Sequence, residues 1–187
     1  LSTTFSPTLL ELGMVNGKVS LIPHTSDVTN VLWYNKKLLS GAGVAPPKTW
    51  PELLAACDTL NGKGITPIAS GNKDLWAAGN FLAHLSSRVV GEQVYDETLS
   101  GKASFDTPQW KAAFEAVAQL QQHKCVNASA NAITDNEGAQ LFFRGKAAMH
   151  PIGSWLVSWA IDEAPDLDFD YVNLPSVPGG AGDQGSV

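Results

Sequence analysis

Long apolar runs, clusters of basic residues and cysteines are all scarce in this chain of 187 residues. No apolar stretch approaches the ~20 residues that a membrane-spanning helix needs, and no signal peptide is visible. The twelve Lys and Arg residues are scattered, and the formal net charge is −6. We therefore expect no nucleic-acid partner, because a phosphate-binding surface requires clustered positive charge.

Motifs for covalent catalysis, phosphate binding and metal binding are also missing. The sequence has no GxGxxG, no P-loop and no metal-ligand spacing, and Ser154 lies in PIGSWLV rather than in a GxSxG elbow. We expect neither a cofactor nor a metal. The two cysteines, Cys57 and Cys125, form no CxxC pair. They are either two buried thiols or, in an exported protein, a single disulfide.

Hydrophobic residues are plentiful, at 44% of the chain, and six of them are tryptophans. Most tryptophans must be buried, but a surplus suits a site that stacks flat ligands. Trp33, Trp50, Trp110 and Trp159 fit core positions on strand or helix faces. Trp76 and Trp155 remain as candidates for a binding site.

Short apolar runs alternate with helical patterns along the chain. Capping boxes at Thr49 and Thr134 each predict the start of a helix. Alternation of this kind predicts an α/β architecture. The expected strands cover residues 18–23, 28–34, 65–69 and 168–174, and the expected helices cover residues 7–12, 35–40, 50–61 and 75–90, with others beginning at 108 and 135.

The order of several sequence blocks resembles one known family. The blocks are GKVSLIPHTSDVTNVLWYNKKLL, GVAPPKTWPELLAACDTL, GITPIASGNKDLWAAGNF, GKASFDTPQWKAAFEAV and LFFRGKAAMHPIGSW. Together they are similar to the family 1 extracellular solute-binding proteins, the sugar-binding receptors of bacterial ABC importers. YNKKLL followed by PPKTWPEL is the most specific part, and the resemblance extends from about Val15 to Gly180.

This resemblance implies two α/β lobes of the type II periplasmic-binding-protein fold, joined by a hinge, with the ligand in the cleft between them. Residues 1–27 would be the end of the first-lobe segment and a hinge crossing, 28–174 the second lobe, and 175–187 a truncated return crossing. A complete member is about twice as long, so the chain is expected to be a fragment. The complete protein would be a monomer.

The resemblance also implies a function. The protein would bind a mono- or oligosaccharide between the lobes and deliver it to the transmembrane subunits of an ABC permease. Its place would be periplasmic or extracellular, either free or anchored as a lipoprotein.

A sugar pocket needs flat aromatic side chains beneath the ring and short polar groups around its edge. Trp155, which follows Gly153 at an expected strand-to-helix turn, lies where the family places a stacking aromatic. Alternatively, Trp155 occupies a core position. Trp76 would supply a second apolar wall.

Polar candidates lie near these tryptophans in the sequence or near the expected hinge. Asp74 either binds sugar hydroxyls or caps the following helix. Asp27 and Asn30 would add polar contacts near the first hinge crossing, or else belong to an ordinary turn and an exposed strand face. His24 could join them, although a lone histidine is more often structural.

Two other functions compete with sugar binding. Glycoside hydrolysis needs two facing carboxylates, and Asp27 and Asp74 are the available pair, but nothing in the sequence ties them together. A lobe with only a structural role is the third alternative.

Overall fold

The structure is a computed structural model that describes residues 4–22 and 27–182. His24 and the end of the strand expected at 18–23 lie outside these residues. The strands are β1 (Met14–Val15), β2 (Lys18–Val19), β3 (Val31–Asn35), β4 (Thr66–Ile68), β5 (Ala147–His150) and β6 (Phe169–Asn173). The helices are α1 (Pro7–Leu12), α2 (Lys36–Gly41), α3 (Trp50–Gly62), α4 (Trp76–Val90), α5 (Glu92–Leu99), α6 (Pro108–Gln122), the 3₁₀ turn η1 (Ala130–Ala132), α7 (Asp135–Phe143) and α8 (Leu156–Glu163).

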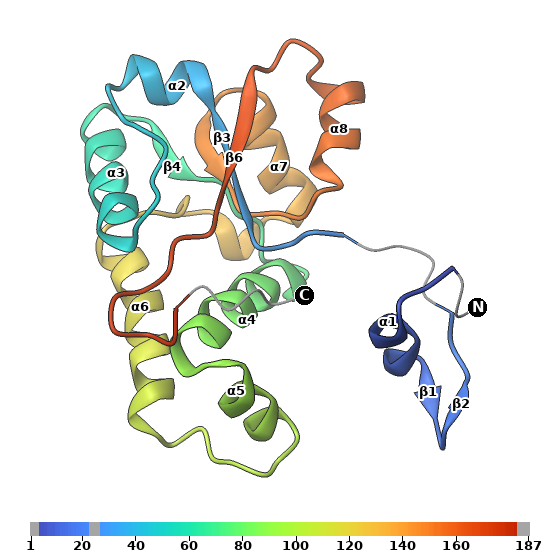
Figure 1. The fold of residues 1–187 in the computed structure, drawn as a ribbon. Coiled ribbons are helices and arrows are strands. Elements are labelled where there is room, and N and C mark those ends of the chain that lie inside the picture. The colour runs from blue at the N-terminus through green and yellow to red at the C-terminus, as the bar shows by residue number, and fades with distance from the viewer. Residues whose placement is uncertain (1–3, 23–26, 183–187) are drawn as a thin grey trace.

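One mixed sheet, in the order β4-β5-β3-β6, organises the main body. β4 and β5 run parallel, while β3 is antiparallel to both of its neighbours, β5 and β6. A parallel bridge from Ile68 to Val126 extends the pairing beyond β4. Helices cover the sheet on both sides (Figure 1). The α/β architecture predicted from the sequence is confirmed.

The core is divided between the two faces of the sheet because successive side chains of a strand point in opposite directions. In β3, Leu32 packs in a cluster with α3 residues such as Leu53, whereas Val31 and Trp33 pack in a second cluster with Phe142 of α7. Trp33, Trp50 and Trp110 are buried as predicted. Trp159 is only half-buried and packs at the margin of the second cluster.

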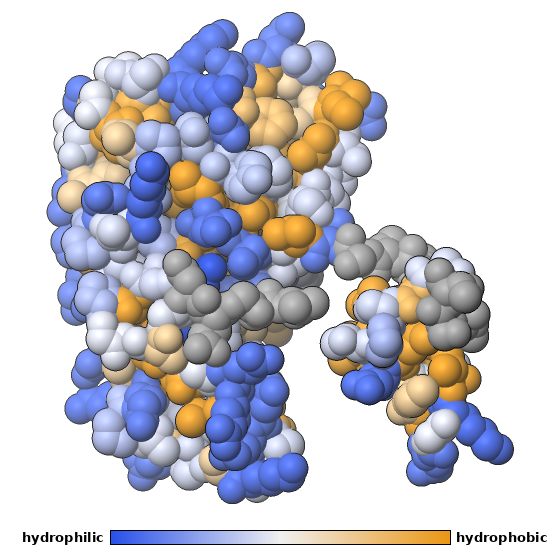
Figure 2. Space-filling view, in the orientation of Figure 1, coloured by the Kyte–Doolittle hydropathy of each residue, from blue (hydrophilic) through white to orange (hydrophobic). Residues whose placement is uncertain are grey.

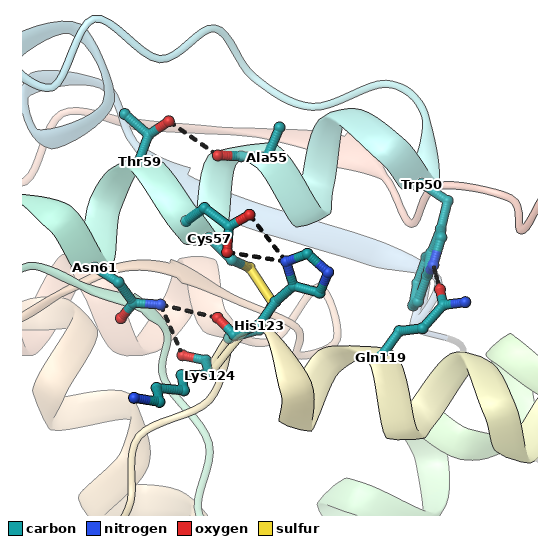
Figure 3. The surroundings of a disulfide bond; sticks show 10 residues. Trp50, Ala55, Cys57, Thr59, Asn61, Gln119, His123 and Lys124 are labelled. Carbon is teal, nitrogen blue, oxygen red and sulfur yellow. Dashed lines mark hydrogen bonds and ion pairs between the residues drawn. A yellow bond between two sulfur atoms is a disulfide. The ribbon is translucent and has the colours of Figure 1, made fainter.

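Cys57 of α3 and Cys125, which follows α6, form a disulfide with both residues fully buried. The surrounding contacts also join α3 to α6 (Figure 3). The Trp50 indole N–H donates to the Gln119 side-chain oxygen at 2.7 Å, and the Asn61 amide donates to the carbonyl oxygens of His123 and Lys124. Of the two states that the sequence allowed for these cysteines, the structure has the disulfide.

Several expected elements differ from those observed. β2 ends at Val19, because β1 and β2 form only a short hairpin, and β3 begins at Val31 rather than at residue 28. α5 was not predicted from the sequence. A pattern of Trp110, Phe114, Val117 and Leu120 in the sequence predicts one apolar stripe on α6, but Phe114 is 49% exposed, and the buried residues are Trp110, Ala113, Ala116 and Leu120.

The N-terminal segment, α1 with the β1–β2 hairpin, lies apart from the main body (Figure 1). It carries apolar side chains on its surface (Figure 2). The exposed ones are Leu12, Met14, Val15, Val19, Leu21 and Ile22.

Candidate functional site

Two loops leave the same edge of the sheet because β4 and β5 are parallel. The loop after β4 leads to Trp76 at the start of α4, and the loop after β5 leads to Trp155 just before α8. In open α/β sheets, ligands bind beside the carboxyl ends of the strands. The sheet topology thus brings together two tryptophans that are 79 positions apart in the sequence (155 − 76).

The rings of Trp76 and Trp155 lie 6.0 Å apart between centroids, with their planes tilted by 46°. Trp76 is 43% exposed, and Trp155 is half-buried. Neither ring is fully buried, although Trp155 also packs against the second core cluster. We call these two rings, with Gly153, the aromatic surface.

Gly153 allows the Trp155 ring to take this position. A β-carbon built on Gly153 would overlap the six-membered part of the Trp155 indole, so any larger residue would displace the ring. The loop is held from below by Trp33, whose indole N–H donates to the Ile152 carbonyl oxygen at 2.8 Å. This hydrogen bond from a buried core residue therefore fixes the position of the loop that carries the aromatic surface.

Trp76 is positioned by unusual backbone geometry. Leu75 occupies the N-cap position of α4 with φ +66° and ψ −24°, and no side chain caps the helix. A left-handed conformation is uncommon for a residue other than glycine. The possibility that Asp74 is the N-cap is therefore wrong. Asp74 is exposed, and its backbone carbonyl accepts from the Trp76 N–H at 2.9 Å.

Asp27 reaches the loop after β5 through Ser154. The Ser154 hydroxyl donates to Asp27 Oδ1 at 2.9 Å and accepts from the Val28 N–H at 3.2 Å. The Ser154 N–H in turn donates to the Val28 carbonyl oxygen at 2.8 Å. The structure thus brings Asp27 beside Gly153 and Trp155. Ser154 was not predicted as a site residue, because its partners Asp27 and Val28 lie 127 and 126 positions away in the sequence.

Asn30 and Thr29 border the same region. The Asn30 carbonyl oxygen accepts from the Leu174 N–H at 2.9 Å, and Asn30 is half-buried. Thr29 Oγ1 lies 2.6 Å from His84 Nε2. Burial lowers the pKa of His84, and the charge of Arg88 lowers it further. His84 and Thr29 were not predicted as site residues.

Two cavities adjoin the aromatic surface. A small one of about 10 Å³ lies against Trp76, Thr29 and His84. A large one of about 750 Å³ shares Ala77, Phe81 and Pro151 with it. None of the six predicted site residues (Trp155, Trp76, Asp74, Asp27, Asn30 and Gly153) lines the large cavity. The predicted residues therefore lie around an open surface rather than within the 750 Å³ cavity.

Within residues 4–22 and 27–182, no helix is both long and apolar enough to cross a membrane.

Comparison with known proteins identifies the family. The model of the family described as bacterial extracellular solute-binding protein matches residues 1–187, and the chain belongs to this family. A probable sugar-binding periplasmic protein of Rhizobium meliloti (strain 1021) is 30% identical over 163 residues, covering 85% of this chain and 37% of that protein. An uncharacterized ABC transporter extracellular-binding protein of Pyrococcus horikoshii is 26% identical over 170 residues. The match covers 89% of this chain and 38% of that protein.

Solved structures agree with these sequence relatives. A chitin oligosaccharide binding protein superposes with a TM-score of 0.84 at 28% identity, covering 92% of this chain and 44% of that one. A protein studied for xylan utilization by the thermophilic bacterium Caldanaerobius polysaccharolyticus gives the same TM-score and identity, with coverages of 97% and 47%. The chain spans less than half the length of these relatives. The solute-binding fold predicted from the sequence, as part of a larger architecture, is confirmed.

Proposed function

We propose that the aromatic surface is one wall of a carbohydrate-binding cleft. The observation that carries this proposal is the pair of partly exposed rings of Trp76 and Trp155, 6.0 Å apart at the carboxyl edge of the sheet. The C–H face of a sugar ring is apolar and packs on such rings, while its hydroxyls need polar partners. Relatives described as sugar-binding and chitin oligosaccharide binding proteins support the same ligand class.

The polar partners proposed are Asp74, next to Trp76, and Asp27 with Asn30 beside the loop of Trp155. Both carboxylates are exposed and can accept hydrogen bonds from sugar hydroxyls. Gly153 contributes by its lack of a side chain. The Asp27 carboxylate already accepts from Ser154, which leaves its other oxygen for a ligand.

We further propose the division of the chain. Residues 1–27 would be the end of a first-lobe segment with a hinge crossing, 28–174 the second lobe, and 175–187 the start of a return crossing. The position of α1 and its hairpin outside the main body supports a boundary near residue 27 (Figure 1). The exposed apolar side chains of that segment support its packing against a first lobe.

In the complete protein, the first lobe would close over the sugar, and closure would be stabilised by contacts that form only when both lobes touch the ligand. The closed monomer would then be recognised by an ABC permease at the outer face of the membrane, in the periplasm or outside the cell, with or without a lipid anchor. Its role would be binding rather than catalysis.

The test is isothermal titration of the 187-residue chain with chito- and xylo-oligosaccharides and with common mono- and disaccharides. Trp155→Ala should weaken binding of the preferred sugar by roughly 30-fold, about 2 kcal/mol, because a buried aromatic contact is lost. Trp159→Ala is the matched control, since Trp159 is a half-buried tryptophan of α8. Equal affinity in both variants would reject the aromatic surface as the site, and release of reducing ends from the oligosaccharides would reject a pure binding role.

A further inference from the structure

The large cavity lies between β4, α4 and the end of α6, and it extends to the first residue of α7. Its volume of about 750 Å³ falls within the range of small-molecule sites. Much of its wall is apolar, with Ile68 of β4, Phe81 and Leu82 of α4, and Val117 and Leu120 of α6. Such a wall suits the hydrocarbon part of an organic ligand.

Three buried polar atoms on this cavity have no hydrogen-bond partner. They are Asp135 Oδ2, His150 Nε2 and Asn72 Oδ1. Asp135 is 3% exposed and His150 is 1% exposed. Buried polar groups in native proteins are almost always hydrogen-bonded, so each exception requires an explanation.

The contact of His150 Nδ1 shows which ring nitrogen of His150 carries the hydrogen. Nδ1 lies 3.0 Å from the Ala69 carbonyl oxygen, which can only accept, so Nδ1 carries the hydrogen. Burial lowers the pKa of His150 to about 4, so the ring is neutral near pH 7. Nε2 is therefore a bare acceptor on a residue that lines the cavity.

Asn72 and Asp135 are also acceptors. The Asn72 amide nitrogen donates to Asn131 Oδ1 at 3.0 Å, which leaves the amide oxygen as the unpartnered atom. Burial raises the pKa of Asp135 to about 6, and the charge of Asp74 adds to this effect. The Asp135 carboxylate is still mostly ionised near pH 7 and has no described cationic partner.

The loop after β4 holds these three residues in one arrangement. Ala69 binds His150, and the Asn72 N–H donates to the Ala130 carbonyl oxygen at 2.7 Å. Gly71 approaches the start of α7 so closely that a β-carbon on it would overlap the Thr134 carbonyl and approach the Asp135 backbone nitrogen. A single short segment thus connects all three acceptors.

The ligand that fits must donate hydrogen bonds and carry positive charge. An ammonium group has three N–H donors and no acceptor, whereas a neutral polyol would bring acceptors as well and leave the Asp135 charge uncompensated. Lys124, the basic side chain among the lining residues besides His150, is exposed, and no described ion pair joins it to Asp135. The described residues contain no group of three or more metal-ligating His, Cys, Asp or Glu side chains.

We propose that this cavity binds an organic ammonium or guanidinium ion with an apolar body, its cationic head at Asp135 and its body against Phe81, Leu82 and Val117. The cation is either a free amine or the lysine or arginine side chain of a polypeptide, since both present the same chemistry. The site is distinct from the proposed sugar cleft, because none of the cleft residues lines the cavity.

The test is titration calorimetry of the 187-residue chain with n-butylammonium and agmatine at millimolar concentrations, with 1-butanol as an uncharged probe of similar shape. Both cations should bind and 1-butanol should bind at least about tenfold more weakly, because charge-assisted hydrogen bonds at a buried carboxylate are strong. The same titration with N-acetyl-lysine methylamide distinguishes the sources. Binding of this probe as tight as that of butylammonium indicates a polypeptide side chain, and exclusion of it indicates a free amine.

Asp135→Asn should reduce binding of both cations at least about tenfold, while Asp96→Asn, the same change on the exposed face of α5, should leave it unchanged. If Asp135→Asn does not fold, Val117→Trp serves instead, because it adds bulk at a partly exposed position of the cavity wall and leaves the three acceptor residues unchanged. Absence of binding by all three cations, equal binding of 1-butanol, or full binding by both Asp135→Asn and Val117→Trp would overturn the proposal.

Discussion

The aromatic surface and the large cavity lie close together, because the small cavity against Trp76 shares Ala77, Phe81 and Pro151 with the large one, yet the two regions differ in their physical character. Around the aromatic surface, polar groups such as Asp27 and Ser154 are exposed or paired, and the unusual feature is the exposure of two large rings. In the cavity, the apolar side chains form ordinary walls, and the unusual feature is a set of buried acceptors without donors. One region offers contact area, and the other offers unsatisfied hydrogen-bonding capacity.

This difference separates the consequences of mutation in the two regions. Removing the partly exposed rings of Trp76 and Trp155 should lower stability less than removing a fully buried ring would. Buried unpartnered groups already lower the stability of the folded state, because each was taken out of water without compensation. Substitutions at the aromatic surface should therefore change binding, and substitutions at the cavity should change stability as well.

The largest effect is expected from the disulfide, which lies on the cavity side. Cys57→Ala/Cys125→Ala opens a link across 68 positions and should lower the free energy of unfolding by about 4 kcal/mol, because the unfolded chain gains freedom. Urea unfolding measures the loss. Cation binding should weaken more than sugar binding in this variant, since Lys124 and Val126, on either side of Cys125, line the cavity. Equal weakening of both would show that the two regions are not mechanically separate.

His150 should give the next largest effect, seen as acid sensitivity. Its pKa falls from the ordinary 6.5 to about 4 in the folded chain, so the unfolded chain binds the proton more tightly. The free energy of unfolding is therefore unaffected by protonation of His150 above pH 6.5. As the pH falls from 6.5 toward 4, it decreases by about 3 kcal/mol. His150→Gln should abolish this loss when urea unfolding near neutral pH is compared with unfolding near pH 4. An unchanged acid response would mean that His150 is hydrated.

Asp135 should affect the pH dependence of stability in the opposite direction to His150. Its pKa rises from 3.8 to about 6 on folding, so the folded chain binds the proton more tightly, and this stabilisation is lost as the pH rises through 6. Asp135→Asn should therefore raise the free energy of unfolding above pH 7 by about 2–3 kcal/mol, with the gain vanishing near pH 4. Asp96→Asn, at an exposed position, should change stability by no more than a few tenths of a kcal/mol. A stability loss in Asp135→Asn above pH 7 would show that the carboxylate has a partner.

The smallest effect is expected at Gly153. In Gly153→Ala the new methyl group displaces the Trp155 ring, and sugar binding should weaken by about 1 kcal/mol, roughly fivefold. Titration with the preferred sugar measures the change. Gly41→Ala is the matched control, because nothing lies within 4 Å of a β-carbon built there. Unaltered affinity in Gly153→Ala would mean that the sugar does not depend on this orientation of Trp155.

Local patterns in the sequence predicted much of the fold. The capping boxes at Thr49 and Thr134 start α3 and α7 as expected, because capping depends on residues only three positions apart. The strand expected at 28–34 begins three residues late, since a strand extends only where it finds a partner, and β3 pairs with β6 from Val31 onward. α5 was missed because its sequence, EQVYDETL, is short and mostly polar.

The candidate residues show a similar division. The sequence singled out Trp76, Trp155 and Gly153, whose neighbours in the chain are unusual, but not the contact between the two rings. It contained no signal for Asp135 as a buried carboxylate, because a first-turn acidic residue within a capping box is ordinarily exposed. Burial arises there from the loop after β4, which packs on the start of α7 through Gly71.

The sequence by itself determined the α/β class, most helix starts, the family and the surplus of tryptophans, because each depends on spacing or on the order of blocks along the chain. Only the tertiary structure decided that Cys57 and Cys125 are bonded, that Trp76 meets Trp155, and that three acceptors line one cavity without donors. The physical reason is that these features require segments up to 79 residues apart to come into contact, and patterns of neighbouring residues do not specify such contacts.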